Sequence, residues 1–126
     1  MPQTKKLLFI MEAGGYGDLR PFFEALGFET VVETSARRGM NRLKAWQPDI
    51  VVADFYRRYF HDRVSNLESL LAVATRNAET RIIVLYDPFH AADIELLKQR
   101  HRIDAALPLP LPLSMPALQA ALSGST

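Results

Sequence analysis

The centre of this chain carries an apolar run that ends in a carboxylate, Gln47-Pro48-Asp49-Ile50-Val51-Val52-Ala53-Asp54-Phe55. A continuous run rich in valine and isoleucine is typical of a strand that is buried on both faces of a parallel sheet. In open parallel sheets, ligands bind outside the carboxyl ends of the strands. We therefore expect the chain to reach the surface at Asp54 and to direct this carboxylate toward a functional site.

Two other apolar runs end in the same way. The run LLFIM leads to Glu12, and the run RIIVL is followed by Tyr86 and Asp87. If these strands are parallel neighbours of the strand that ends at Asp54, the three acids lie at one edge of the sheet. The sequence therefore predicts an acidic pocket at that edge, formed by Glu12, Asp54 and Asp87.

Length and composition predict one globular domain, residues 1–126, since 48% of the residues are hydrophobic and 23% are charged. A net charge of +1 argues against nucleic acid and membrane surfaces as partners of the whole domain. The absence of cysteine excludes disulfides, thiolate ligands and cysteine nucleophiles. The Lys5-Lys6 pair precedes an apolar stretch shorter than the roughly 7 to 15 residues of a signal-peptide core. We expect a cytoplasmic protein.

Hydrophobic periodicity alternates along the chain between strand-like runs and helix-like segments, which predicts five βα units around a parallel sheet. Turn and capping residues separate these segments. We expect strands over 5–11, 28–33, 49–55, 81–85 and 105–109, a helix over 91–100, and four further helices that begin after the capping residues Asp18, Ser35, Ser65 and Ser114.

Five strands alternating with five helices, with acids after the first and third strands, resemble the receiver domain of two-component response regulators over nearly the whole chain. The resemblance implies an α/β, flavodoxin-like (βα)5 three-layer sandwich, in which a parallel five-stranded sheet has the order 2-1-3-4-5. It also implies that Asp54 is equivalent to the phosphoacceptor aspartate. Glu12 and Asp54 would be the metal ligands if Mg²⁺ binds, although we expect no bound cofactor.

The chain departs from the receiver pattern at several positions that serve the phosphoryl group. Met11 replaces one of two acids, and a thioether is a poor ligand for a hard cation such as Mg²⁺. Tyr86 replaces a small hydroxyl residue, and Ala106 replaces the aromatic switch residue. Leu109 replaces a lysine, while the following Pro110 is a candidate cis-proline. These departures predict a degenerate, pseudo-receiver-like domain in which phosphorylation is impaired.

The loop after Asp54 is dense in aromatic and cationic residues. Such residues are enriched at protein interfaces, which makes the loop a candidate interaction surface, although its rings could instead cover the end of the sheet. Either arginine of the loop could also reach back to lock the acidic pocket in a metal-free state. The candidate interaction residues are Tyr56, Arg57, Arg58, Tyr59 and Phe60.

A glycine-rich turn, Gly14-Gly15-Tyr16-Gly17, follows the first predicted strand and could present backbone donors to a phosphate. The third glycine of a dinucleotide fingerprint is absent, because Arg20 stands in its place. A tight turn over the acidic pocket is the simpler interpretation. Binding of a nucleotide or another small ligand at Gly14–Gly17 is a third hypothesis for function.

Taken together, the sequence predicts a signalling module without enzymatic activity that acts through a protein partner or as a homodimer. No serine or histidine belongs to a recognisable catalytic triad. The alternative is a functional single-domain response regulator, phosphorylated on Asp54 with Mg²⁺. A histidine kinase is an expected partner only under this alternative.

Overall fold

The computed structural model describes residues 5–12, 18–55, 67–76, 79–108 and 115–123. Within them, five parallel strands form one sheet of order β2-β1-β3-β4-β5, which confirms the predicted flavodoxin-like topology. The strands are β1 (Lys6–Ile10), β2 (Glu29–Glu33), β3 (Ile50–Asp54), β4 (Arg81–Tyr86) and β5 (Ala105–Pro108). The helices are α1 (Arg20–Ala25), α2 (Ala36–Trp46), α3 (Leu67–Ala74), α4 (Ala91–Arg100) and α5 (Met115–Ser123), with a 3₁₀ turn, η1 (Pro88–His90), before α4.

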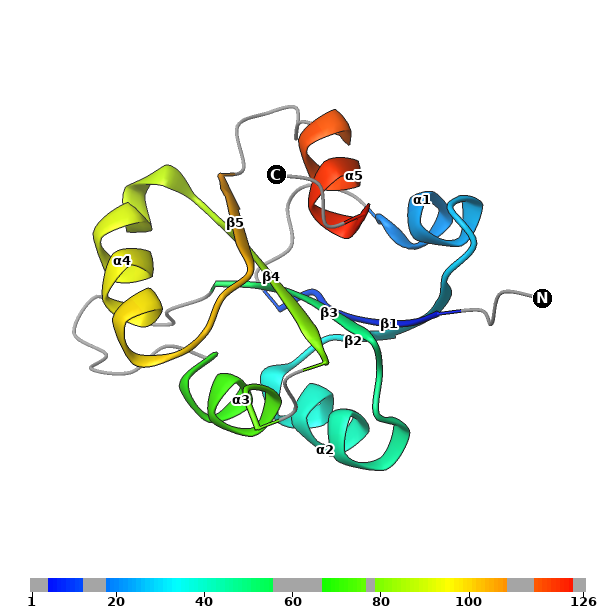
Figure 1. The fold of residues 1–126 in the computed structure, drawn as a ribbon, viewed down its shortest axis with the longest axis horizontal. Helices are drawn as coiled ribbons and strands as arrows, with labels where there is room; N and C mark the ends of the chain where they lie inside the picture. The colour runs from blue at the N-terminus through cyan, green and yellow to red at the C-terminus, as the bar shows by residue number, and fades with distance from the viewer. Residues whose placement is uncertain (1–4, 13–17, 56–66, 77–78, 109–114, 124–126) are drawn as a thin grey trace.

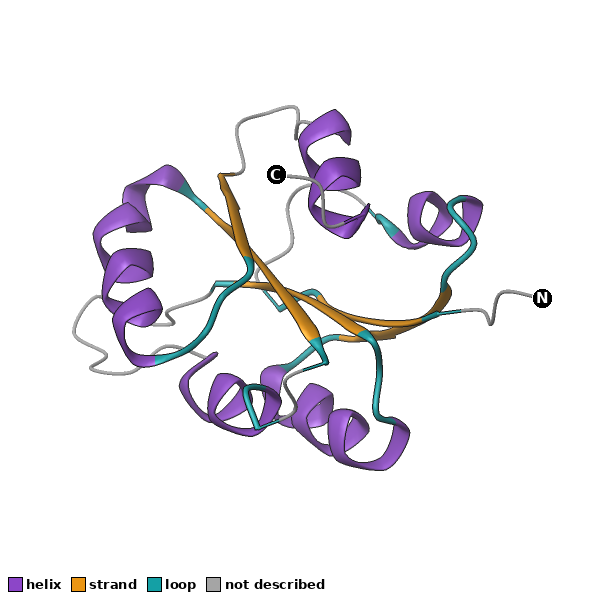
Figure 2. Cartoon of the chain, viewed as in Figure 1, coloured by secondary structure: helices purple, strands orange, loops and turns teal. Residues whose placement is uncertain are grey.

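Helices cover both faces of the sheet (Figures 1 and 2). One core cluster joins the sheet to α2, α3 and α4, and a second joins it to α1 and α5. Successive residues of β1 alternate between them, since Leu8 belongs to the first cluster and Leu7 to the second. Every residue of β3 is buried, as the continuous apolar run predicts.

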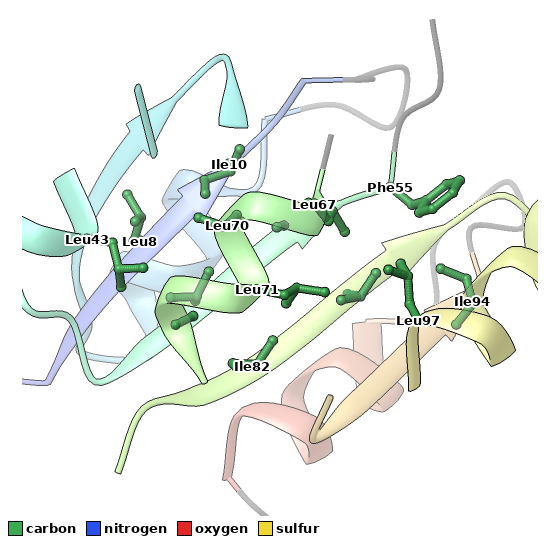
Figure 3. Close-up of a cluster of buried hydrophobic side chains, with 14 residues drawn as sticks. Leu8, Ile10, Leu43, Phe55, Leu67, Leu70, Leu71, Ile82, Ile94 and Leu97 are labelled. Carbon is green, nitrogen blue, oxygen red and sulfur yellow. The ribbon is translucent and has the colours of Figure 1, made fainter. Parts of the chain in front are cut away.

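In the core cluster under α2, α3 and α4, the buried residues of each helix recur at the spacing of helical turns (Figure 3). Leu67, Leu70 and Leu71 of α3 are buried, at the spacing that places them on one helix face. Ile94 and Leu97 do the same in α4. Each of these helices therefore buries one apolar face. No helix in the described ranges has the length and apolar composition that a bilayer-spanning segment requires.

Two helix boundaries follow local chemistry that the sequence displays. Ser35 caps α2 as predicted, because its hydroxyl accepts a hydrogen bond from Arg38 N at 3.2 Å. The helix ends at Gln47, whose φ of 51° is left-handed, directly before Pro48. The predicted bounds of α4 are confirmed without a shift.

The predicted start of α1 at Asp18 is wrong by one residue. Leu19 occupies the N-cap position, and its side chain makes no capping hydrogen bond. Asp18 instead accepts a hydrogen bond from Arg20 N at 3.0 Å, which is the local two-residue turn that aspartate favours. The predicted helix starts at Ser65 and Ser114 lie outside the described residues.

A close approach between α2 and β1 gives a test of this packing. A Cβ atom on Gly39 would overlap Ile10 Cδ1 and lie 2.7 Å from Ile10 Cγ1. We expect Gly39→Ala to destabilise the protein by about 1–3 kcal/mol in urea denaturation, although alanine favours a helix, because the added methyl overpacks the core. Ala45→Gly on the exposed side of α2 is the control and measures the helix-propensity term alone. A Gly39→Ala protein more stable than the parent would contradict this packing.

Candidate functional site

The carboxyl ends of the parallel strands bring the predicted site residues to one edge of the sheet. β1 lies between β2 and β3, with Ile10 in register with Ala53, and Glu12 follows two residues after Ile10. Asp54 is the last residue of β3 and is in register with Leu85 of β4. The central strands therefore bring Glu12 and Asp54 together.

The carboxylate of Asp54 is inside the protein. Its side chain has no exposed area, and its Oδ1 accepts a hydrogen bond from the backbone N–H of Glu12 at 2.8 Å. The expectation that the chain surfaces at Asp54 is wrong, because Phe55 continues the pairing with β4 through Phe55 N to Leu85 O at 2.7 Å. Phe55 is also buried and packs in the core under α3 and α4 (Figure 3).

Glu12 forms hydrogen bonds through its backbone N–H and through its carboxylate. While its backbone N–H donates to Asp54, its carboxylate oxygen Oε1 accepts from Ala36 N, the first residue of α2, at 3.4 Å. The N-terminal end of a helix carries unpaired N–H groups and a partial positive charge, which favour a carboxylate there. The Glu12 carboxylate is thus directed toward α2, while its backbone holds Asp54.

The third predicted acid has a local function. Asp87 is exposed and caps the 3₁₀ turn η1, since its Oδ1 accepts from Phe89 N at 2.9 Å. Mg²⁺ prefers several oxygen ligands in octahedral geometry. Among the residues that the structure describes, no three histidine, cysteine, aspartate or glutamate side chains converge on one point. Glu12 and Asp54 are thus the two acids that this edge of the sheet brings together, while Asp87 caps η1.

The substituted positions that are described have apolar surroundings. Met11 extends the pairing of β1 with β2 through Met11 N to Glu33 O at 2.9 Å, and its side chain packs on the core under α1 and α5. Tyr86 and Ala106 are partly buried and pack on the opposite core cluster. Leu109 and Pro110 lie outside the described residues, and so do two candidate sites, Gly14–Gly17 and Tyr56–Phe60.

A series of rings at the site was not identified from the sequence. The ring of buried Phe55 lies 5.0 Å from the ring of His90, which lies 5.3 Å from the ring of Phe89. Phe89 is 82% exposed, so these three rings connect the residue after Asp54 to the surface beside α4. The only sequence signal was an aromatic residue next to a histidine directly after the fourth strand, in Asp87-Pro88-Phe89-His90.

Comparisons with known proteins find similar structures but no match in sequence. No protein-family model matches the chain, and no curated protein matches it in sequence. Three similar solved structures are a response regulator receiver domain protein from Clostridium thermocellum, the receiver domain of the Francisella response regulator 1452, and a Burkholderia pseudomallei response regulator with a phosphorylated aspartic acid, a calcium ion and citrate.

The three structures superpose over almost the whole chain. The Clostridium protein is 16% identical with a TM-score of 0.76, and the match covers 94% of this chain and 91% of that one. The Francisella domain is 19% identical with a TM-score of 0.70, covering 96% of each chain. The Burkholderia protein is 19% identical with a TM-score of 0.67, covering 94% of this chain and 66% of that one. The chain therefore has the fold of a response regulator receiver domain.

Proposed function

We propose that this chain is a receiver-like signalling module that phosphorylation does not switch and that acts by binding a protein partner or a second copy of itself. The observation that carries the proposal is the position of the Asp54 carboxylate, which has no exposed area and accepts a hydrogen bond from Glu12 N. A nucleophile of this kind must reach a phosphodonor in line with the leaving group. A buried, hydrogen-bonded carboxylate is poorly placed for that attack.

The groups around Asp54 support the same conclusion. Formation of an acyl phosphate needs positive charge and positioned donors where negative charge develops. Glu12, whose backbone N–H contacts Asp54, accepts a hydrogen bond from Ala36 N through its own carboxylate. Met11 and Ala106 carry neither charge nor a hydrogen-bonding group, and both pack on the cores. The described surroundings therefore offer little that would stabilise a phosphoryl group.

A working phosphorylation switch is the second candidate. It is favoured by the place of Asp54 at the end of β3, beside Glu12, in the same fold as the Burkholderia protein that carries a phosphorylated aspartic acid and a calcium ion. Under this alternative, Asp54 is the phosphoacceptor, Mg²⁺ the metal and a histidine kinase the upstream partner. Neither candidate requires enzymatic activity toward another substrate.

Phosphorylation distinguishes the two candidates. We expect incubation with acetyl phosphate and Mg²⁺ to leave the intact mass of the protein unchanged, because Asp54 is inaccessible and lacks a described metal site. Asp54→Asn is the matched control, and a response regulator that accepts phosphate from the same donor shows that the conditions work. A labile phosphate adduct that appears in the parent protein and is lost in Asp54→Asn would establish the second candidate instead.

Stability gives an independent measure of the role of Asp54. We expect Asp54→Ala to lower the free energy of unfolding by about 1–3 kcal/mol, because the N–H of Glu12 loses its acceptor. Asp54→Asn keeps an oxygen acceptor and should lose less. Urea denaturation monitored by circular dichroism measures both variants. An Asp54→Ala protein that is more stable than the parent would contradict the proposed structural role of Asp54. It would show that the carboxylate lowers the stability of the protein, as residues of reactive sites commonly do.

A further inference from the structure

Positive charge is unevenly distributed over the surface of this domain. The 11 residues of α2 include four basic residues and no acidic one, although the net charge of the whole chain is only +1. All four basic side chains are exposed around the solvent side of the helix, with Arg38 and Arg42 toward Glu33 and Lys44 toward α3. These residues are Arg37, Arg38, Arg42 and Lys44.

Three cations on other helices have carboxylate partners. Arg20, Lys98 and Arg100 pair with Glu24, Glu95 and Glu68, at 2.9, 3.3 and 2.7 Å. On α2, only one cation has a carboxylate partner, since Arg42 Nε lies 3.2 Å from Glu33 Oε2. The other three form no ion pair or side-chain hydrogen bond with any residue in the described ranges.

A groove beside these cations combines charge with apolar surface. α2 and α3 lie next to each other (Figure 1), and between their C-terminal ends is a cavity of about 250 Å³. Leu43 and Val73 contribute apolar lining, while Lys44 and Arg76 contribute cations. Arg76 is the second residue after the end of α3. It is exposed and likewise has no ion pair with a described residue.

We propose that this cationic face, formed by Arg37, Arg38, Arg42, Lys44 and Arg76, is a docking surface for an acidic protein segment in which carboxylates alternate with apolar side chains. Guanidinium groups match carboxylates in geometry and can bind them through two hydrogen bonds. The Arg42–Glu33 pair shows that a carboxylate already binds at one side of this face. The groove between α2 and α3 accommodates an apolar side chain of the partner next to Lys44 and Arg76.

The chemistry of the face favours a protein over a nucleic acid. An 11-residue helix is about 16 Å long and offers few phosphate contacts. Single-stranded nucleic acid also requires aromatic side chains on which its bases stack. Trp46 is the only aromatic residue in α2 and α3, and it is half-buried, with the Lys6 ammonium 5.6 Å from its ring centre. The apolar lining of the groove has no counterpart in a phosphodiester backbone.

This inference deepens the proposed function, because it names the surface and the partner chemistry through which the module acts. The face is on α2 and α3, whereas Asp54 is inaccessible and is tested by phosphorylation. Phosphorylation of Asp54 would contradict the proposed function and leave the cationic face able to bind its partner. Absence of peptide binding would contradict only the proposal about the cationic face. The two proposals therefore fail in different experiments.

Binding of a labelled peptide tests the proposal. The probe is a short fluorescent peptide in which glutamates alternate with leucines, and fluorescence anisotropy measures its affinity for the full-length protein. We expect specific binding that weakens by about tenfold or more in the triple variant Arg37→Gln, Arg38→Gln, Lys44→Gln, because several charge pairs are lost together. All three side chains are exposed, so the fold is retained, and circular dichroism confirms this.

A second triple variant separates docking from general charge attraction. Lys5→Gln, Arg20→Gln and Lys98→Gln remove the same charge from exposed positions outside α2 and α3, and should change the affinity by less than about twofold. Equal weakening in both triple variants would overturn the proposal. So would absence of binding, equal binding of a peptide with lysine in place of glutamate, or equal binding of single-stranded DNA. Self-association that only the α2 triple variant abolishes would assign the face to a second copy and would also overturn it.

Discussion

The fold depends on the burial of β3 between β1 and β4. Every residue of β3 is buried, and its register with both neighbours is set by continuous parallel pairing from Ile50 onward. A strand that is apolar on both faces must be covered on both faces, so helices are required above and below the sheet. The same pairing brings the ends of β1 and β3 together, which positions Glu12 beside Asp54.

That proximity does not produce a cluster of free carboxylates. Parallel strands end at one edge of the sheet, where backbone N–H groups of turns and helix starts also need acceptors. The carboxylates of Glu12 and Asp87 accept hydrogen bonds from the backbone N–H groups of Ala36 and Phe89. The carboxylate of Asp54 accepts one from the N–H of Glu12. Side chains that resemble a metal-binding set in the sequence are thus used to hold the turns and helix starts of this edge. In the described residues, these three acids accept hydrogen bonds from backbone N–H groups at the edge of the sheet.

The pairing of charged side chains differs between the helices. Between α3 and α4, Glu68 contacts the exposed Arg100 at 2.7 Å and the half-buried ring of His101 at 3.0 Å. On α2, the cations lie on the solvent side with Glu33 as a neighbouring acid. The surface of α2 is therefore cationic, although the net charge of the whole chain is only +1. The net charge therefore does not show how charge is distributed over the surface of this domain.

The sequence alone determined the elements, because hydrophobic period and capping are local: the run to Asp54, the Ser35 cap and the bounds of α4 all depend on neighbouring residues. It also placed Met11, Tyr86 and Ala106 at positions where the resemblance to receiver domains implies an acid, a small hydroxyl residue and an aromatic residue. Only the tertiary structure decided where the carboxylates go. Glu12 forms hydrogen bonds with Ala36 and Asp54, which are 24 and 42 residues away in the sequence. Such distant residues come within hydrogen-bonding distance only when the sheet has formed.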